Sequence, residues 1–238
     1  MSEEYNRVIS KHYAAYRPPL HKMILARMLT PDTSFLSGLD IGCGTGISTI
    51  ALSQYCRKTY GVDPSEAMIN QTISNDLIEY NVSYGDNLKL PTDSIDIVTF
   101  AGSLSYAKSN ELVAELLRVC IPTAQIIAYD FEVQLTECLQ SLGLEINRVK
   151  STYDHAINFS DYDEFNEITV KSETLVLNVD SEQLAHILLS SSKRYDVIVK
   201  HFNSIEPFTL LVNLLDTLGS NHSIKVDVYY SMHGIVIK

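Results

Sequence analysis

Residues 39–46 read LDIGCGTG, an apolar stretch with one acid that runs into glycines at positions 42, 44 and 46. The apolar part is typical of a short buried strand, and the glycines allow positive φ angles and the close approach of a ligand. A helix that starts near Gly46 would direct unpaired N–H groups at that ligand. The stretch therefore predicts a strand, a ligand-binding turn and a helix, with an anionic or carboxylate-bearing ligand such as a nucleotide.

Strands and helices are predicted to alternate on both sides of this turn. Apolar stretches predict strands at 37–42, 58–63, 81–86, 94–102 and 124–131, and helical periodicity predicts helices at 19–29, 46–56, 65–75, 110–120 and 133–143. This alternation favours right-handed crossovers and a parallel sheet. The predicted fold class is α/β, a doubly wound, mostly parallel sheet with an inserted α+β cap before the last strands.

The pattern divides the chain into four segments. Residues 1–36 are predicted to form an N-terminal helical lid, and 37–150 the α/β core. Residues 151–222 are predicted to form a cap that contacts substrate, with one or two strands at 167–179 and helices at 181–191 and 206–218. Residues 223–238 are predicted to complete the sheet as a hairpin that turns near His233 and Gly234.

Composition excludes several classes of function. Eighteen basic and 29 acidic residues give a net charge of -11, and no cluster of lysine and arginine suggests nucleic acid as a partner. No apolar stretch is long enough for a membrane span, and the polar N-terminus resembles no signal peptide. We therefore expect a cytoplasmic protein. The four cysteines are scattered without metal-ligand spacing, so neither a disulfide framework nor a metal site is expected.

The spacing of the glycines distinguishes between nucleotides. A dinucleotide fingerprint reads G-x-G-x-x-G, whereas Asp40 and the alternating glycines here read D-x-G-x-G-x-G. That pattern resembles motif I of the class I S-adenosylmethionine-dependent methyltransferases, in their small-molecule, methyltransferase-11-like branch. The resemblance covers about residues 10–145 and implies S-adenosylmethionine as the cofactor.

Two further acids extend the resemblance. Asp63, predicted at the end of the second strand, would accept the ribose hydroxyls, although dehydrogenases use an acid at the same position. Asp86, predicted at the end of the third strand, would bind the adenine amino group. The alternative interpretation is that Asp63 and Asp86 are ordinary turn residues that bind no ligand. The cofactor-binding residues that the resemblance implies are Arg17, Asp40, Gly42, Cys43, Gly44, Gly46, Asp63, Pro64, Asp86, Asn87, Ala101 and Gly102.

The segment HYAAYRPP, residues 12–19, resembles the Y-x-x-Y-R-P stretch that covers the cofactor in this branch. There Arg17 would approach the methionine carboxylate, or it would pair with a surface acid instead. Substrate contacts are expected from the segment after the fourth strand and from an aromatic cluster in the cap that includes Phe159, Tyr162 and Phe165. The expected substrate residues are Tyr13, Tyr16, Ser103, Ser105, Tyr106, Tyr153 and His155.

No catalytic residue is fixed by the sequence. Tyr106, His12, His155 and His201 are candidates, and His233 is a further possible base, although a lone histidine is more often structural. The favoured function is methyl transfer to an oxygen, nitrogen or carbon atom of a small-molecule acceptor. A non-catalytic cofactor-binding partner subunit, a protein methyltransferase with an acidic cap, and a nicotinamide oxidoreductase are the alternatives, in that order. The acceptor and the oligomeric state stay open.

Overall fold

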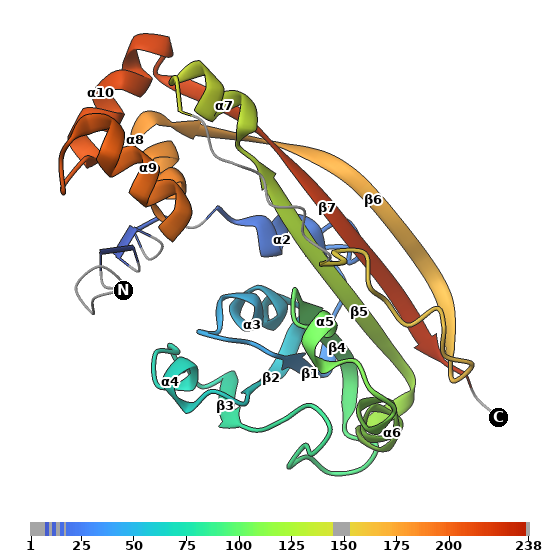
Figure 1. The fold of residues 1–238 in the computed structure, drawn as a ribbon. Helices are drawn as coiled ribbons and strands as arrows, with labels where there is room; N and C mark the ends of the chain where they lie inside the picture. Colours follow the sequence, from blue (N-terminus) through green and yellow to red (C-terminus); the bar gives the residue numbers. More distant parts are fainter. Residues whose placement is uncertain (1–7, 10, 13–14, 17, 145–152, 237–238) are drawn as a thin grey trace. The chain divides into compact units, whose positions relative to one another are not determined.

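A computed structural model of the protein describes residues 8–9, 11–12, 15–16, 18–144 and 153–236. Seven strands form one mostly parallel sheet in the order β3-β2-β1-β4-β5-β7-β6 (Figure 1), so the predicted α/β fold class is confirmed. The strands are β1 (Phe35–Ile41), β2 (Cys56–Asp63), β3 (Ile78–Val82), β4 (Ile95–Ala101), β5 (Cys120–Gln134), β6 (Phe165–Asp180) and β7 (Asn221–Ile235).

The helices follow the strands as the alternation predicts, although several are short. They are α2 (Leu20–Leu25), α3 (Ile47–Leu52), α4 (Glu66–Ile69), α5 (Leu104–Ala107), α6 (Asn110–Val119), α7 (Thr136–Ser141), α8 (Ser181–Leu189), α9 (Ser192–Phe202) and α10 (Phe208–Leu218). A 3-10 turn, Ser53–Tyr55, follows α3. Ser65 caps α4, because its hydroxyl accepts the N–H of Met68 at the start of that helix.

The strand order places a topological switch point beside β1. β1 pairs in parallel with β2 on one side and with β4 on the other, and β2 and β4 pair in parallel with β3 and β5 respectively. The chain therefore builds the sheet in one direction from β1 to β3 and in the other from β4 onward. In such sheets, ligands bind beyond the carboxyl ends of the strands at the switch point.

Buried aliphatic and aromatic side chains fill one face of this part of the sheet. The core cluster includes Leu39, Val98 and Phe100 from the strands and Leu112 and Leu116 from α6. The two α6 leucines are one turn apart, so they lie on the same side of that helix. This packing holds the carboxyl ends of β1 and β4, and the loops that follow them, in fixed positions.

The chain divides into two compact units. One unit contains Pro19–Phe131, Tyr153–Glu173 and Val228–Lys238, and it holds the glycine turn. The other contains Met1–Pro18, Glu132–Thr152 and Thr174–Asp227, and it holds α7 to α10. In the second unit, Asp180 caps α8 with a reciprocal hydrogen-bond pair to Gln183, and buried leucines on α8 and α10 pack together.

In the second half of the chain one prediction is wrong, one is narrowed to a single strand, and one helix was not predicted. The predicted C-terminal hairpin is wrong, because β7 is a single strand that includes both His233 and Gly234. Gly234 sits in extended backbone rather than in a turn, so it provides no reversal. Residues 167–179 lie within one strand, β6, and α9 is a helix that the periodicity analysis missed.

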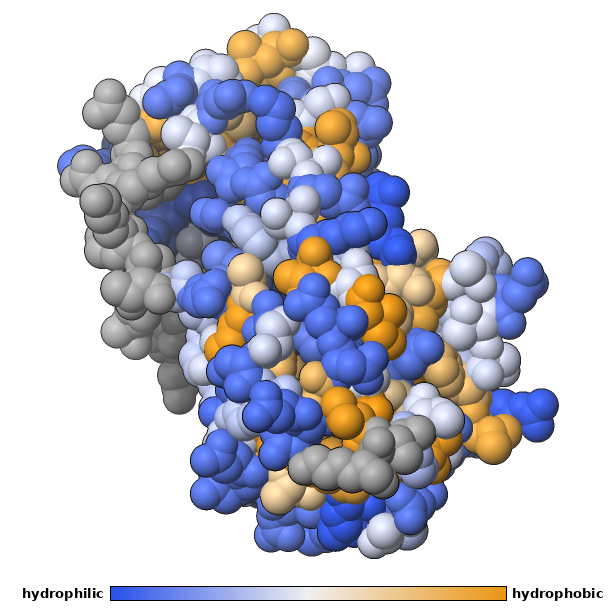
Figure 2. All heavy atoms as spheres, turned by 90° about the vertical axis from the view of Figure 1, so that its right-hand side faces the viewer, coloured by the Kyte–Doolittle hydropathy of each residue, from blue (hydrophilic) through white to orange (hydrophobic). Residues whose placement is uncertain are grey.

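On the face that Figure 2 shows, hydrophobic residues occur in scattered patches among hydrophilic ones. Single exposed apolar side chains of this kind are ordinary on protein surfaces and carry no functional argument.

Candidate functional site

A pocket of about 560 Å³ opens at the switch point. Four of the strands contribute to its wall, through the residues at or just beyond their carboxyl ends. The lining residues are Ile41, Gly42, Asp63, Pro64, Ser83, Tyr84, Gly85, Asp86, Ala101, Gly102, Ser103, Tyr106, Ala107, Lys108 and Ser109. This volume lies in the range of small-ligand and cofactor sites, roughly 300–1,000 Å³. We call it the switch-point pocket.

The three glycines of the turn serve different purposes, and all three have positive φ. A Cβ at Gly42 would lie 2.4 Å from the Cβ of Ser103, so this glycine allows the loops after β1 and β4 to touch. A Cβ at Gly46 would lie 2.4 Å from the hydroxyl of Tyr80. A Cβ at Gly44 would meet nothing within 4 Å, so only Gly44 leaves open space beside the turn.

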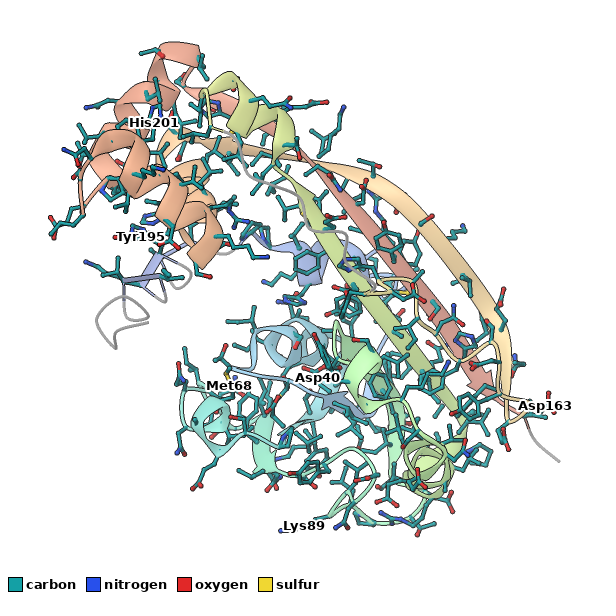
Figure 3. The ribbon with its side chains drawn as sticks, viewed as in Figure 1. Asp40, Met68, Lys89, Asp163, Tyr195 and His201 are labelled. Atoms are coloured by element: carbon teal, nitrogen blue, oxygen red, sulfur yellow. The ribbon has the colours of Figure 1, made fainter. Side chains whose placement is uncertain are left out.

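The carboxylate of Asp40 supports the turn from inside. Asp40 is fully buried, and its two oxygens accept hydrogen bonds from the hydroxyls of Ser48, Thr49 and Thr99 at 2.6, 2.7 and 2.9 Å. Figure 3 shows Asp40 among the strands of its unit. Burial raises the pKa of Asp40, and the three hydroxyls oppose that rise. Asp40 is absent from the lining of the pocket and has this supporting role, so its contact with the cofactor stays a prediction.

Cys43 is likewise 5% exposed and does not line the pocket. Burial raises the pKa of its thiol, with Asp40 and Asp63 adding to the effect, so the side chain is a neutral packing group. Its backbone N–H, like that of Gly42, donates to the carbonyl of Val62, which ties the turn to β2.

Asp63 connects the end of β2 to the glycine turn. Its Oδ2 accepts the backbone N–H of Gly44 at 2.9 Å, and its Oδ1 accepts that of Ser65 at 2.8 Å. The carboxylate also lines the pocket, together with Pro64. Since a carboxylate has about four lone-pair positions, each oxygen of Asp63 can accept one more donor from a ligand.

Asp86 lines the pocket, although not from the end of a strand as predicted. β3 ends at Val82, and Asp86 follows it in an exposed turn. The turn is closed by the hydroxyl of Ser83, which donates to the carbonyl of Asn87 at 2.6 Å. Asn87 itself does not line the pocket, so it contributes to the shape of the turn.

The loop after β4 forms the opposite wall. Ala101, Gly102, Ser103 and Tyr106 line the pocket, and the Tyr106 side chain is mostly exposed. Their contacts with cofactor and substrate stay predictions. The hydroxyl of Ser103 donates to the carbonyl of Ile41, which fixes this loop to the end of β1. Ser105 instead lines a separate, smaller cavity next to Gly102.

Tyr153 and His155 lie beside that smaller cavity, and both contact the carboxylate of Asp130. Oδ2 of Asp130, near the middle of β5, is 2.9 Å from the hydroxyl of Tyr153 and 2.9 Å from Nδ1 of His155. Sequence reasoning missed Asp130, Tyr84 and Lys108. An acid in the fifth predicted strand, AYDF, was the available signal for Asp130, whereas loop contacts such as Tyr84 have no pattern of their own.

The other predicted residues fall in different places. Tyr13 and Arg17 lie outside the described residues. His12 packs in the second unit, 2.9 Å from His186 between their Nδ1 atoms and stacked on Phe208. His201 is an exposed residue on α9 (Figure 3). Tyr16, like His12 and His201, belongs to the second unit. A role for these three residues at the pocket stays a prediction.

Among the described residues, no group of three or more metal-ligating side chains could hold a metal ion. No helix in the same part of the chain is long and apolar enough to cross a membrane.

The strand order and the pocket define an α/β domain with a pocket of cofactor size at its switch point. Comparison with known proteins shows what this domain is similar to. A family model described as a methyltransferase domain matches residues 39–128. A methyltransferase-named protein of Dictyostelium discoideum is 27% identical over 124 residues, which are 52% of this chain and 47% of that protein. An uncharacterized methyltransferase of Schizosaccharomyces pombe is 34% identical over 36% of this chain and 33% of its own.

A solved structure assigned as a type II methyltransferase from Anaeromyxobacter dehalogenans has the same fold, with a TM-score of 0.62 at 18% identity, over 92% of this chain and 98% of that one. Residues 39–128 are therefore similar to a methyltransferase domain, and the chain has the fold of a solved methyltransferase. The chain covers 47% of the length of the first curated relative and 33% of the second.

S-adenosylmethionine is the cofactor of the class I methyltransferases that this chain resembles, and the switch-point pocket fits it. The pocket volume suits a nucleoside-sized ligand, Asp63 keeps acceptor capacity for ribose hydroxyls, and Gly44 leaves space beside the turn. Asp86 lies on the same wall and provides a second carboxylate for an amino group.

Proposed function

We propose that this protein transfers a methyl group from S-adenosylmethionine to an oxygen, nitrogen or carbon atom of a small-molecule acceptor, in the cytoplasm. The observation that carries the proposal is the switch-point pocket, whose wall combines Asp63, Asp86 and the loop Ala101–Gly102. When it is bound there, the sulfonium cofactor supplies an already activated methyl group. The protein then needs to hold the acceptor in line with that group and to exclude water.

The residues of this chain suit such positioning. Asp63 would accept the ribose hydroxyls, and Asp86 the adenine amino group, while Asp40 and the Ser103 hydroxyl keep the two loops of the pocket in place. Tyr106, on the wall beyond Gly102, would contact the acceptor. Holding two reactants in the correct geometry can lower a barrier by roughly 7–11 kcal/mol. No strongly activated nucleophile is therefore required of the protein.

Calorimetric titration of the full chain with S-adenosylhomocysteine, and separately with NADH, tests this proposal. We expect micromolar binding of S-adenosylhomocysteine and none of NADH. The control is Asp76→Asn, which removes an exposed carboxylate from a turn away from the pocket and should bind normally. Absence of S-adenosylhomocysteine binding would overturn the proposal.

Binding, complex formation and methylation assays distinguish the two alternative functions. Binding without methyl transfer to small molecules, together with a stable complex with a second protein, would favour a non-catalytic partner subunit. Methylation of lysine- or arginine-rich peptides that is lost at high salt would favour a protein methyltransferase with an acidic substrate region.

A further inference from the structure

A hydrogen-bonded cluster of Asp130, Tyr153 and His155 lies next to the switch-point pocket, and the cofactor site just described does not use it. The Tyr153 hydroxyl is 2.9 Å from Oδ2 of Asp130 and 3.1 Å from the carbonyl of Gly102, a pocket-lining residue. The His155 ring stacks on Tyr229 with an interplanar angle of 16° and contacts Tyr153 edge-on. The ring is therefore held in one orientation from two sides.

The carboxylate of Asp130 determines which nitrogen of His155 carries the proton. A carboxylate only accepts hydrogen bonds, so the 2.9 Å contact requires a proton on Nδ1 of His155. In the neutral ring, Nε2 then has a free lone pair and can receive a proton. Asp130 is itself fixed, because its Oδ1 accepts the backbone N–H of Phe131 at 2.7 Å.

Two cavities adjoin this histidine, and one of them shares Gly102 with the switch-point pocket. This small cavity, of about 10 Å³, is lined by Gly102, Tyr153, Asp130 and His155 among others. That volume is about enough for one water molecule. A larger cavity of about 230 Å³ also includes His155, with Lys171 and Tyr229 in its wall. His155 therefore lies between the edge of the switch-point pocket and a second space that can hold part of a ligand.

From this geometry we propose that the acceptor is a hydroxyl compound and that Nε2 of His155 receives its proton, directly or through one water molecule in the small cavity. Asp130 is the positioning residue, and the larger cavity holds the remainder of the acceptor. This inference rests on the proposed methyl transfer.

The step balances in atoms and charge. The acceptor oxygen forms a bond to the methyl carbon, the bond from that carbon to sulfur breaks, and the hydroxyl proton goes to Nε2 of His155. The products are a methyl ether, the neutral thioether and an imidazolium. The positive charge thus passes from the sulfonium to His155, beside the carboxylate of Asp130.

Several other titratable groups surround His155. Tyr153 adjoins it in the small cavity and in turn contacts Tyr106, whereas Tyr229, Tyr230 and Lys171 line the larger cavity with it. Burial raises the pKa of Tyr153, and the nearby Asp130 carboxylate adds to that rise, so Tyr153 stays protonated near neutral pH. His155 is thus the group in this cluster suited to accept a proton.

The first test needs no acceptor. Histidine-selective ¹⁵N NMR of the full chain near neutral pH, with His155→Gln for assignment, should show one tautomer of His155, protonated on Nδ1 and bare on Nε2. Asp130→Leu should abolish that single tautomer. The control Asp227→Leu removes another strand carboxylate, one that accepts hydrogen bonds from Gln134 and Thr174, and should leave the His155 signal unchanged. A proton on Nε2 in the unaltered protein would overturn the proposal.

The second test uses methyl-labelled S-adenosylmethionine with a panel of phenols, alcohols and carboxylic acids. His155→Gln should lower kcat on the hydroxyl acceptors by roughly 10²–10⁴-fold. Its affinity for S-adenosylhomocysteine should stay within about twofold of the unaltered protein. The control His222→Gln removes a histidine that hydrogen-bonds Ser181 in the other unit and should retain activity.

The outcomes separate this inference from the proposed function. If S-adenosylhomocysteine does not bind, the proposed function fails, and the proton-accepting role of His155 fails with it whichever tautomer is found. If the protein binds cofactor but methylates only carboxylic acids, equally well in His155→Gln, methyl transfer stands and the role of His155 is overturned.

Discussion

The carboxylate of Asp63 accepts the backbone N–H of Gly44 at 2.9 Å, across the turn that separates β1 from α3. The same carboxylate lines the switch-point pocket, so one side chain both shapes the turn and faces the ligand. Since Gly44 is the glycine with open space beside it, this hydrogen bond fixes the part of the turn that a ligand can approach.

Asp63→Ala should therefore weaken the binding of S-adenosylhomocysteine by more than the loss of one contact. A hydrogen bond to a charged group contributes about 1.5–3 kcal/mol, and this substitution also releases the N–H groups of Gly44 and Ser65. We expect at least a tenfold increase in Kd by calorimetry. Asp76→Ala is the matched control. An unchanged Kd in Asp63→Ala would remove Asp63 from the binding site.

Gly46→Ala should destabilise the fold more than Gly44→Ala does. Both glycines have positive φ, which costs alanine about 1–2 kcal/mol. At Gly46 the new Cβ would also lie 2.4 Å from the Tyr80 hydroxyl, and overpacking of this kind costs roughly 1–3 kcal/mol more. Urea unfolding measures both free energies. Equal losses would show that Tyr80 does not restrict the turn.

Thr99→Val should lower the free energy of unfolding by about 1–3 kcal/mol. The substitution keeps the shape of the side chain but removes the hydroxyl that donates to Oδ1 of Asp40 at 2.9 Å, which leaves a buried carboxylate oxygen without that partner. Thr217→Val, on the exposed side of α10, is the control and should change the value by less than about 0.5 kcal/mol. A comparably small effect at Thr99 would contradict the supporting role of Asp40.

Stability should decrease as the pH falls from about 6.5 towards about 4. Burial lowers the pKa of His12 from 6.5 to about 4, and repulsion from His186 and Lys11 adds to this. Between these values the unfolded chain binds more protons than the folded one, so acid favours unfolding. Burial also lowers the pKa of His186 and of His233.

Urea unfolding at about pH 7.5 and about pH 5 measures this dependence. His12→Gln should reduce the difference between the two pH values, whereas Thr217→Val should keep it. If His12→Gln has the same pH dependence as the unaltered protein, the contact between His12 and His186 does not contribute to it.

The sequence predicted the strand-and-helix alternation around LDIGCGTG because apolar residues gather in the strands and follow helical spacing in the helices. It also predicted the position of Asp63 at the end of the second strand. The end of the third strand was misplaced, because β3 stops at Val82 where its pairing with β2 stops, and this depends on a neighbour distant in sequence. The composition of the residues near Val82 does not show where their pairing with β2 ends.

The glycine turn at residues 42–46 was likewise predictable only in part. The need for glycine at 42, 44 and 46 was predictable from spacing, but the neighbours that require it, Ser103 and Tyr80, come from the loop after β4 and from β3 and could not be identified. The predicted turn near His233 and Gly234 failed for a related reason. A glycine in a strand resembles a turn signal in sequence, although here it lies in extended backbone beside Asn166.

The position of β7 has a consequence for the order in which the protein assembles. β7 is the last strand along the chain, yet it lies between β5 and β6 in the sheet. During synthesis, β6 thus leaves the ribosome before the strand that joins it to the rest of the sheet. Until residues 221–235 emerge, the long β6 edge lacks its neighbour and exposes unpaired backbone groups, a state that favours association between chains. The nascent protein is accordingly most vulnerable to aggregation just before residues 221–235 are made.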